Sequence, residues 1–170
     1  DTGFAEYVFV HEFGHHFAGL ADEYYTSDVA YETGATDLPE PWEPNVTALK
    51  DPARLKWKEL VEAATPLPTP WTKEAFEKTS RDFQARRKAL LAKGAPPSQI
   101  DDLFREQKKV EAAFFAKEKF TGKVGAFEGA AYEQKGLYRS SADCIMFTRT
   151  EAGFCPVCRR AIERVIDSYR

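Results

Sequence analysis

Apolar residues recur at steps of three and four along residues 4–18, and this spacing predicts an α-helix. Phe4 and Val8 begin one apolar stripe, and a second stripe of apolar or small side chains lies beside it. A helix that is apolar on most of its sides is typical of a buried element. Thr2 could cap the start of the helix, and Gly19 suits the left-handed turn that ends one. We therefore expect a buried helix that ends at Gly19.

The chain after this helix is irregular for a long stretch. Residues 26–71 are rich in proline and predict loops, interrupted by one short helix that begins at the cap-and-first-turn pair Asp51-Pro52. Residues 120–153 are rich in glycine and aromatic residues, which favours tight loops and short strands. From Pro156 onward, one apolar face predicts a closing helix.

Between these segments, residues 72–119 predict a helical hairpin. Its first arm is broken at Gly94 and the prolines that follow, and Ser98 is in position to cap the second arm. The two arms are amphipathic, so we expect the hairpin to cover the core or to stand off it as an insertion. A role in gripping a substrate is the alternative.

Composition indicates a folded domain. The chain has 170 residues, of which 43% are hydrophobic and 14% aromatic, and this excludes a disordered protein. No apolar run approaches the roughly 18 residues that span a bilayer. Acidic residues outnumber basic ones in residues 1–51, which indicates a solvated acidic surface or the surroundings of a cation. Residues 73–119 are more basic, but they mix both signs at helical spacing, so we expect no nucleic-acid partner.

The opening helix carries the sequence HEFGH, in which His11 and His15 are four residues apart. Side chains at this spacing project side by side from a helix, so both imidazoles can reach one ion. Zinc suits such ligands, and a catalytic zinc keeps three protein ligands so that water can take the fourth position. Glu12 would lie beside that water as the general base. This is the H-E-x-x-H pattern of metallopeptidases.

The third ligand has to be a carboxylate or a thiolate, because the only other histidine, His16, is rotated off the face of the first two. Asp22 follows Gly19 closely, where a turn would bring it back to the metal, and we expect Asp22 to complete the site. Glu23 is the next candidate. Glu128 is a distant alternative, of the kind that thermolysin-like enzymes use.

Several stretches together resemble the M64 family of zinc metallopeptidases, which is named for a bacterial immunoglobulin A peptidase. They are HEFGHHFAGLADEYY, PWEPNVT with KWKEL, VGAFEGAAYEQKGLYR, and DCIMF with FCPVCRRAI. The resemblance implies an α+β, metzincin-like catalytic domain over residues 1–170, mostly helical as given, that acts on a protein or peptide substrate. It implies Zn²⁺ bound by His11 and His15, Glu12 as the base, and a secreted, cell-surface or periplasmic location in a bacterium. The hairpin at 72–119 is not among the stretches that carry the resemblance and would be an insertion within this domain.

The resemblance has departures and gaps. In the metzincin pattern H-E-x-x-H-x-x-G-x-x-H/D, the glycine and the third ligand come one residue earlier than Gly19 and Asp22, so the turn has to absorb an extra residue. A metzincin-like domain also needs a sheet before the active-site helix, whose edge strand holds the substrate. We therefore expect residues 1–170 to be the C-terminal part of a catalytic domain. Met146, the only methionine, would form the methionine turn beneath the zinc ligands, or else be an ordinary core residue.

Other residues are candidates for supporting roles. Given the resemblance, we expect a disulfide from Cys144 to Cys155 or Cys158, with a structural zinc site or free thiols as alternatives. Asn45 begins a weak N-x-T glycosylation pattern. Four tyrosines could stabilise the oxyanion of a tetrahedral intermediate or simply pack: Tyr24, Tyr25, Tyr132 and Tyr138.

The sequence therefore predicts a zinc-dependent endopeptidase that hydrolyses peptide bonds by zinc-activated water, with Glu12 as general base. A non-catalytic binding module stabilised by zinc is the main alternative, and a metal-free helical scaffold built on residues 72–119 is another. Glu12 argues against the binding module, because a structural zinc closes with a fourth ligand and needs no base. Neither the cleavage specificity nor the oligomeric state follows from the sequence.

Overall fold

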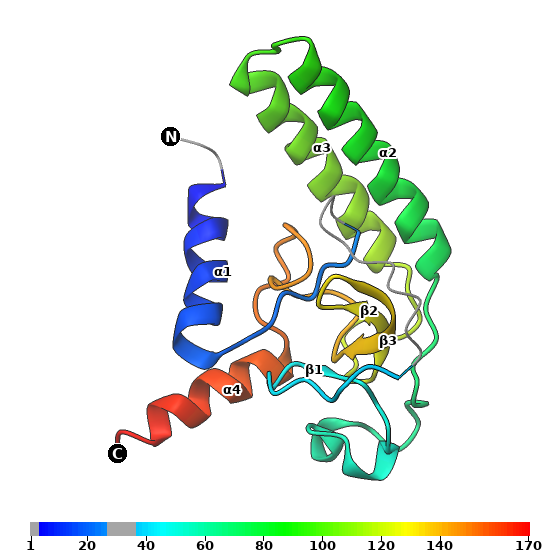
Figure 1. The fold of residues 1–170 in the computed structure, drawn as a ribbon, viewed down its shortest axis with the longest axis vertical. Helices are drawn as coiled ribbons and strands as arrows, with labels where there is room; N and C mark the ends of the chain where they lie inside the picture. Colours follow the sequence, from blue (N-terminus) through cyan, green and yellow to red (C-terminus); the bar gives the residue numbers. More distant parts are fainter. Residues whose placement is uncertain (1–3, 27–36) are drawn as a thin grey trace.

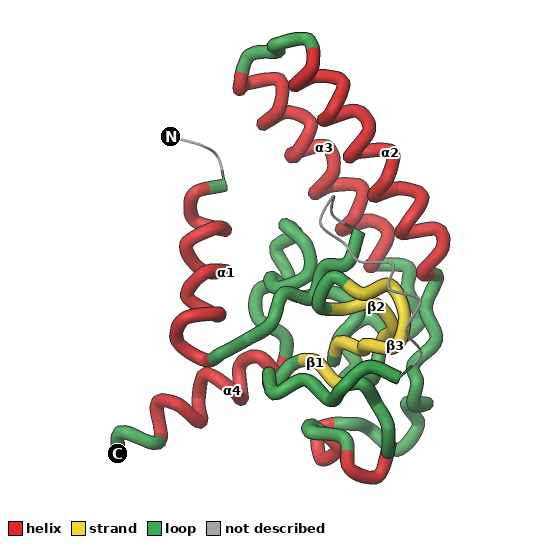
Figure 2. Tube along the Cα trace, in the orientation of Figure 1, coloured by secondary structure: helices red, strands yellow, loops and turns green. Residues whose placement is uncertain are grey.

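The computed structural model describes residues 4–26 and 37–170, and its architecture over these residues is α+β. Figures 1 and 2 show helices around a small antiparallel sheet, joined by long loops. The helices are α1 (Ala5–Ala18), α2 (Lys73–Ala92), α3 (Pro97–Phe115) and α4 (Pro156–Asp167). The strands are β1 (Val46–Thr47), β2 (Phe127–Ala130) and β3 (Glu133–Arg139). Among the described residues, no helix combines the length and apolar character that crossing a membrane requires.

Helix α1 confirms the helix predicted for residues 4–18. Gly19 ends it in the left-handed conformation, with φ of 59°, and its N–H donates to the carbonyl oxygen of His15 at 3.0 Å. Phe4 takes the N-cap position without a side-chain cap bond. The expected cap, Thr2, lies outside the described residues.

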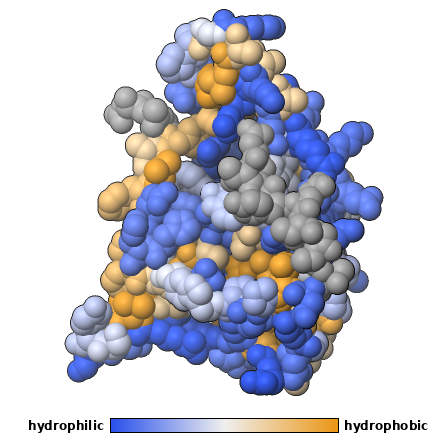
Figure 3. Space-filling view, in the orientation of Figure 1, coloured by the Kyte–Doolittle hydropathy of each residue, from blue (hydrophilic) through white to orange (hydrophobic). Residues whose placement is uncertain are grey.

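The prediction that this helix is buried on most sides is wrong for the described part of the chain. His11 and Gly14 are buried, whereas Val8, Phe9 and Phe13 are exposed, Phe9 by 73%. Figure 3 shows apolar side chains at the surface of α1. The apolar pattern indicates a helix, but it does not indicate which of its sides has a partner.

Gly14 allows the loop that carries Met146 to approach the buried side of α1. A Cβ atom on Gly14 would lie 3.0 Å from Met146 Sδ and 2.9 Å from a ring carbon of Phe154. Met146 itself is fully buried. The methionine therefore packs directly beneath the helix that carries the two histidines.

Helices α2 and α3 form a hairpin that projects from the rest of the molecule (Figure 1). The helices predicted in this region are present, and Gly94, with φ of 65°, lies in the turn between them. The predicted cap of the second arm is wrong: α3 begins at Pro97, with Pro96 as its N-cap and Ser98 already inside the helix. Proline at the first helical position explains the earlier start, since its ring fixes a helical φ and the missing N–H would have no partner there.

The short helix predicted after Asp51 is instead a pair of 3₁₀ turns, Pro52–Arg54 and Lys58–Leu60. The expected cap is present, because Asp51 Oδ1 accepts a hydrogen bond from the Ala53 N–H at 2.9 Å.

The sheet has the order β1-β3-β2, and both pairs are antiparallel. Strand β1 lies in the proline-rich segment that the sequence pattern predicts as loop. Arg139 of β3 is fully buried, donates to the Gly129 carbonyl at 2.8 Å, and lies over the rings of Phe147 and Trp71 at 3.8 and 4.3 Å. Burial lowers the pKa of Arg139 to about 10. Its guanidinium thereby connects the sheet to the loop that carries Met146.

Helix α4 confirms the closing helix and packs against α1. The disulfide expected near its start is wrong for this structure, because Cys144, Cys155 and Cys158 are all free, buried thiols. The sulfurs of Cys144 and Cys158 lie 3.8 Å apart, whereas a disulfide bond is about 2.05 Å long.

Candidate active site

Three side chains predicted as metal ligands converge beside the end of α1. His11 Nε2 lies 3.0 Å from His15 Nε2 and 3.0 Å from Asp22 Oδ1. His15 Nε2 lies 3.2 Å from the same Asp22 oxygen. Tetrahedral zinc with bonds of about 2.0–2.1 Å separates its nitrogen and oxygen ligands by about 3.3 Å. The three atoms therefore fit around one ion of this kind.

The other ring nitrogen of each histidine is held by a main-chain carbonyl. His11 Nδ1 donates to the carbonyl oxygen of Ile145 at 3.0 Å, and His15 Nδ1 donates to that of Leu20 at 2.6 Å. Because a carbonyl can only accept, these bonds keep the proton on Nδ1 and leave both Nε2 atoms available as ligands.

Asp22 and His11 influence each other's ionisation. Burial alone would raise the pKa of Asp22, but hydrogen bonds with His11 and Tyr132 outweigh it and hold that pKa below its ordinary value. Burial alone would lower the pKa of His11, but hydrogen bonds with Asp22 and the Ile145 carbonyl outweigh it and raise that pKa. The pKa of Asp22 is thus shifted toward the ionised carboxylate, the form that binds a cation.

Tyr132 orients the predicted third ligand. Its hydroxyl donates to Asp22 Oδ2 and lies 3.1 Å from the hydroxyl of Tyr24. Ala131 and Tyr132 both have positive φ, 49° and 66°, in the turn between β2 and β3. Such values are uncommon outside glycine. The main-chain N–H groups of these two residues donate to the carbonyls of Asp22 and Tyr24 at 3.0 Å, and thus hold the turn against the ligand segment.

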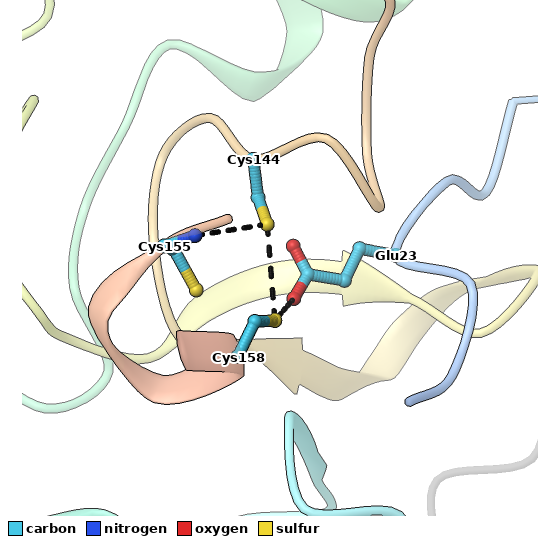
Figure 4. A group of neighbouring side chains, drawn as sticks. All are labelled: Glu23, Cys144, Cys155 and Cys158. Atoms are coloured by element: carbon cyan, nitrogen blue, oxygen red, sulfur yellow. Dashed lines mark hydrogen bonds between the residues drawn. The ribbon is translucent and has the colours of Figure 1, made fainter. Parts of the chain in front are cut away.

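Neither alternative third ligand joins this group. Glu23 points instead toward the three cysteines (Figure 4), and Glu128 forms an ion pair with Lys73 at 2.8 Å. Two of the candidate tyrosines also lie elsewhere: Tyr25 is fully buried against Phe147, and Tyr138 pairs with Glu128 across the sheet. Sequence reasoning missed the contact between Tyr132 and Asp22, because nothing in the local pattern connects residues that are 110 positions apart.

The order of these features along the chain matches a known family. A family model described as IgA peptidase M64 matches residues 1–166. The chain belongs to the IgA peptidase M64 family. The resemblance seen in the sequence is thereby confirmed, and M64 membership makes the chain a peptidase, a hydrolase that acts on protein or peptide substrates. No curated protein matches the chain significantly.

The M64 chain has a cavity of about 300 Å³ that reaches one of the three predicted ligands, His11. Glu12 and His11 line it from α1, and Phe83 and Arg87 of α2 and Phe104 of α3 line it from the hairpin. The hairpin therefore does more than cover the core: it forms one wall of the space that the predicted general base faces.

Glu111 of α3 lines the same cavity and is 4% exposed. Burial raises the pKa of Glu111 from 4.5 to about 7, although a hydrogen bond from Gln107 opposes the shift. The carboxyl is thus a buried acid that titrates near neutrality.

This shift predicts a pH-dependent stability. Between pH 4.5 and about 7, Glu111 ionises in the unfolded chain before it does in the folded one. The free energy of unfolding should therefore fall as pH rises through this window, by about 3 kcal/mol in all, and stay flat above it. Glu111→Gln should remove this contribution. In urea unfolding experiments, the free energy of unfolding of the variant should therefore rise relative to that of the wild type as pH increases.

Glu163→Gln, at an exposed position of α4, is the matched control. Its free energy of unfolding should change with pH as that of the wild type does. If the free energies of unfolding of Glu111→Gln and wild type differed by a constant amount from pH 4.5 to 8, the prediction would be contradicted.

Proposed function

We propose that this M64 chain is a zinc-dependent metalloendopeptidase with a metzincin-like architecture. His11, His15 and Asp22 would hold the zinc ion, and Glu12 would be the general base. The observation that supports this most strongly is the convergence of three ligand atoms within 3.0 to 3.2 Å, one of them on His11, which lines the same cavity as Glu12. Two imidazoles and one carboxylate form a donor set typical of catalytic zinc, which keeps one coordination position open.

The residues around the site have distinct tasks in peptide hydrolysis. When bound, zinc supplies Lewis acidity, which polarises the scissile carbonyl and lowers the pKa of water. Glu12, exposed on α1 one residue after the first ligand, accepts a proton from the attacking water and returns it to the leaving amine. Tyr132 fixes the carboxylate of Asp22, and the carbonyls of Ile145 and Leu20 fix the imidazole rings.

Tyr24 and Tyr132 are the two tyrosines suited to stabilising an oxyanion. Their hydroxyls are 3.1 Å apart, and Tyr24 lines the same cavity as Glu12. Burial raises the pKa of Tyr24 well above its ordinary value. Its hydroxyl therefore stays protonated and able to donate a hydrogen bond.

Metal dependence of peptide cleavage tests the proposal. The purified chain should cleave a casein or mixed-peptide substrate, lose this activity to background after dialysis against a chelator, and regain it on addition of zinc but not magnesium. The reason is that two imidazoles and a carboxylate suit zinc better than magnesium, which prefers oxygen ligands. Full activity in metal-free protein would overturn the proposal. We also propose that the protein is secreted or exported to the cell surface or periplasm, as the sequence resemblance implies.

A further inference from the structure

A second group of potential ligands lies on the other side of the segment that carries Asp22. It consists of Glu23, Cys144, Cys155 and Cys158, and one ligand atom from each lies within 4.8 Å of all the others. Figure 4 shows the carboxylate and the three thiols facing one another. Glu23, Cys144 and Cys158 are fully buried, and Cys155 is 5% exposed. The residues come from three separate parts of the chain, so their convergence is a product of the fold.

Two separations within this group match those of a tetrahedral zinc site. Bonds of about 2.3 Å to sulfur place two sulfurs about 3.8 Å apart, and a sulfur and an oxygen ligand about 3.5 Å apart. The Cys144 and Cys158 sulfurs are 3.8 Å apart, and Cys158 Sγ lies 3.6 Å from Glu23 Oε1.

Glu23 is an unusual residue to bury among thiols. Its Oε1 atom accepts a hydrogen bond from Asn45 Nδ2 at 3.0 Å, but Oε2 is buried with no partner among the described residues. An ionised carboxyl leaves this oxygen as an unpaired acceptor, and a protonated one leaves it as a donor without an acceptor. Burying such a group costs free energy unless something binds it. A cation between the carboxylate and the sulfurs would supply the missing partner.

Three of the four candidate ligands also have an outer partner of the kind that orients metal ligands. The Cys155 N–H points at Cys144 Sγ at 3.4 Å, and the Ser140 hydroxyl lies 3.2 Å from Cys155 Sγ. Asn45, which holds Glu23, is itself fixed by both the N–H and the carbonyl of Ala21 at 2.8 and 2.9 Å. Asn45 is fully buried, so this structure leaves no room for a glycan on it.

The surrounding charge is suited to the same ion. Three thiolates and a carboxylate around a divalent cation leave an excess of negative charge, which is costly to bury alone. The buried guanidinium of Arg139 interacts electrostatically with both Glu23 and Cys144 and offsets part of that charge.

We infer that Glu23, Cys144, Cys155 and Cys158 form a second, structural zinc site. All four positions are taken by protein, which distinguishes it from a catalytic centre. A disulfide is the main competitor, but it would join only two of the three thiols and would leave Glu23 Oε2 without a partner. The inference does not depend on the proposed peptidase activity, because the two sites share no ligand.

The site would join the elements that build the active site. Glu23 follows Asp22 directly, and its N–H donates to the carbonyl of Met146 at 2.8 Å. Cys144 lies two residues before Met146, and Cys158 lies on α4, which packs against α1. A zinc ion here would thus fix the position of the ligand segment relative to the methionine loop.

Metal content per chain tests the inference. Wild-type protein purified without chelator and dialysed against metal-free buffer should contain about two zinc ions per chain by mass spectrometry. The His11→Ala/His15→Ala variant should retain one. Its cobalt-substituted form should show the intense near-ultraviolet absorption of cobalt–thiolate bonds, and X-ray absorption of its zinc form should show Zn–S distances of about 2.3 Å.

Glu23→Gln keeps the shape of the side chain but removes its charge, and should lower the affinity of this site in zinc titrations of the His11→Ala/His15→Ala background. Glu111→Gln, another buried position, is the matched control and should leave the affinity unchanged. Cys155→Ser/Cys158→Ser should lose one zinc ion. Because this variant could fail to fold, the His11→Ala/His15→Ala variant is the one that decides the test. The inference would be overturned if the His11→Ala/His15→Ala variant bound no zinc, or if its cobalt-substituted form lacked the cobalt–thiolate absorption. A disulfide in wild-type protein isolated without reductant would also overturn it.

Discussion

Glu12→Gln is expected to reduce kcat for peptide hydrolysis by about 10²–10⁴-fold, the range that a positioned general base contributes. Zinc content should be unchanged, because Glu12 is exposed and is not one of the three converging ligands. Glutamine has nearly the same shape as glutamate but cannot take a proton from water. The measurement is steady-state cleavage of a fluorogenic peptide, together with zinc analysis of the same preparation.

Glu6→Gln is the matched control, since Glu6 is also exposed on α1 but lies nearly two turns earlier. It should leave both activity and zinc content unchanged. If Glu12→Gln retained full activity with zinc bound, another group would have to be the base. If neither the wild type nor any variant cleaved peptides while zinc stayed bound, the non-catalytic binding module would become the better hypothesis.

Asp22→Ala is expected to weaken zinc binding at the histidine site by more than about 100-fold, because loss of an outer-shell partner alone typically costs about 10- to 100-fold. The variant removes the oxygen that lies 3.0 Å from His11 Nε2 and 3.2 Å from His15 Nε2. Tyr132→Phe removes only the hydrogen bond to Asp22 Oδ2, so we expect a smaller loss, of about 10- to 100-fold. The readout is the activity regained by metal-free protein as free zinc increases.

Glu128→Gln is the control for Asp22→Ala, because Glu128 is the distant carboxylate that the sequence offers as an alternative third ligand. It pairs with Lys73, so the variant should regain activity at the same free zinc concentration as the wild type. The opposite pattern, a large shift for Glu128→Gln and none for Asp22→Ala, would show that the third ligand has been assigned wrongly.

Local spacing in the sequence predicted the elements in which neighbouring residues determine the structure. The helix over residues 4–18, its end at Gly19 and the shared face of His11 and His15 all follow from the helical repeat and from the conformational freedom of glycine. Asp22 was also predictable as a candidate, since it follows that turn closely. The burial of the helix was not, because it depends on which other segments pack against each side.

Local spacing could not predict contacts between segments that are far apart in the sequence. Tyr132 meets Asp22 because the β2–β3 turn bonds to the ligand segment, and no periodicity in the sequence reports such a meeting. The three cysteines suggested a disulfide from their number and setting, but the side chain that faces them is Glu23, which sequence reasoning offered to the other site. Because Asp22 and Glu23 are adjacent, residue types alone do not show which carboxylate faces the histidines and which faces the cysteines.

The adjacency of Asp22 and Glu23 has a consequence for how this chain can vary. One carboxylate faces the two histidines and the next faces the three thiols, so removing a single residue between Gly19 and Asp22 would draw both away from their neighbours at once. The spacing from His15 to Asp22 is one residue longer than in the metzincin pattern, and it is constrained both by the contacts of Asp22 and by those of Glu23. If both proposed sites bind zinc, a shortened version of the loop would have to rebuild two coordination geometries together. We therefore expect insertions and deletions to be tolerated far less here than in the turn at Gly94.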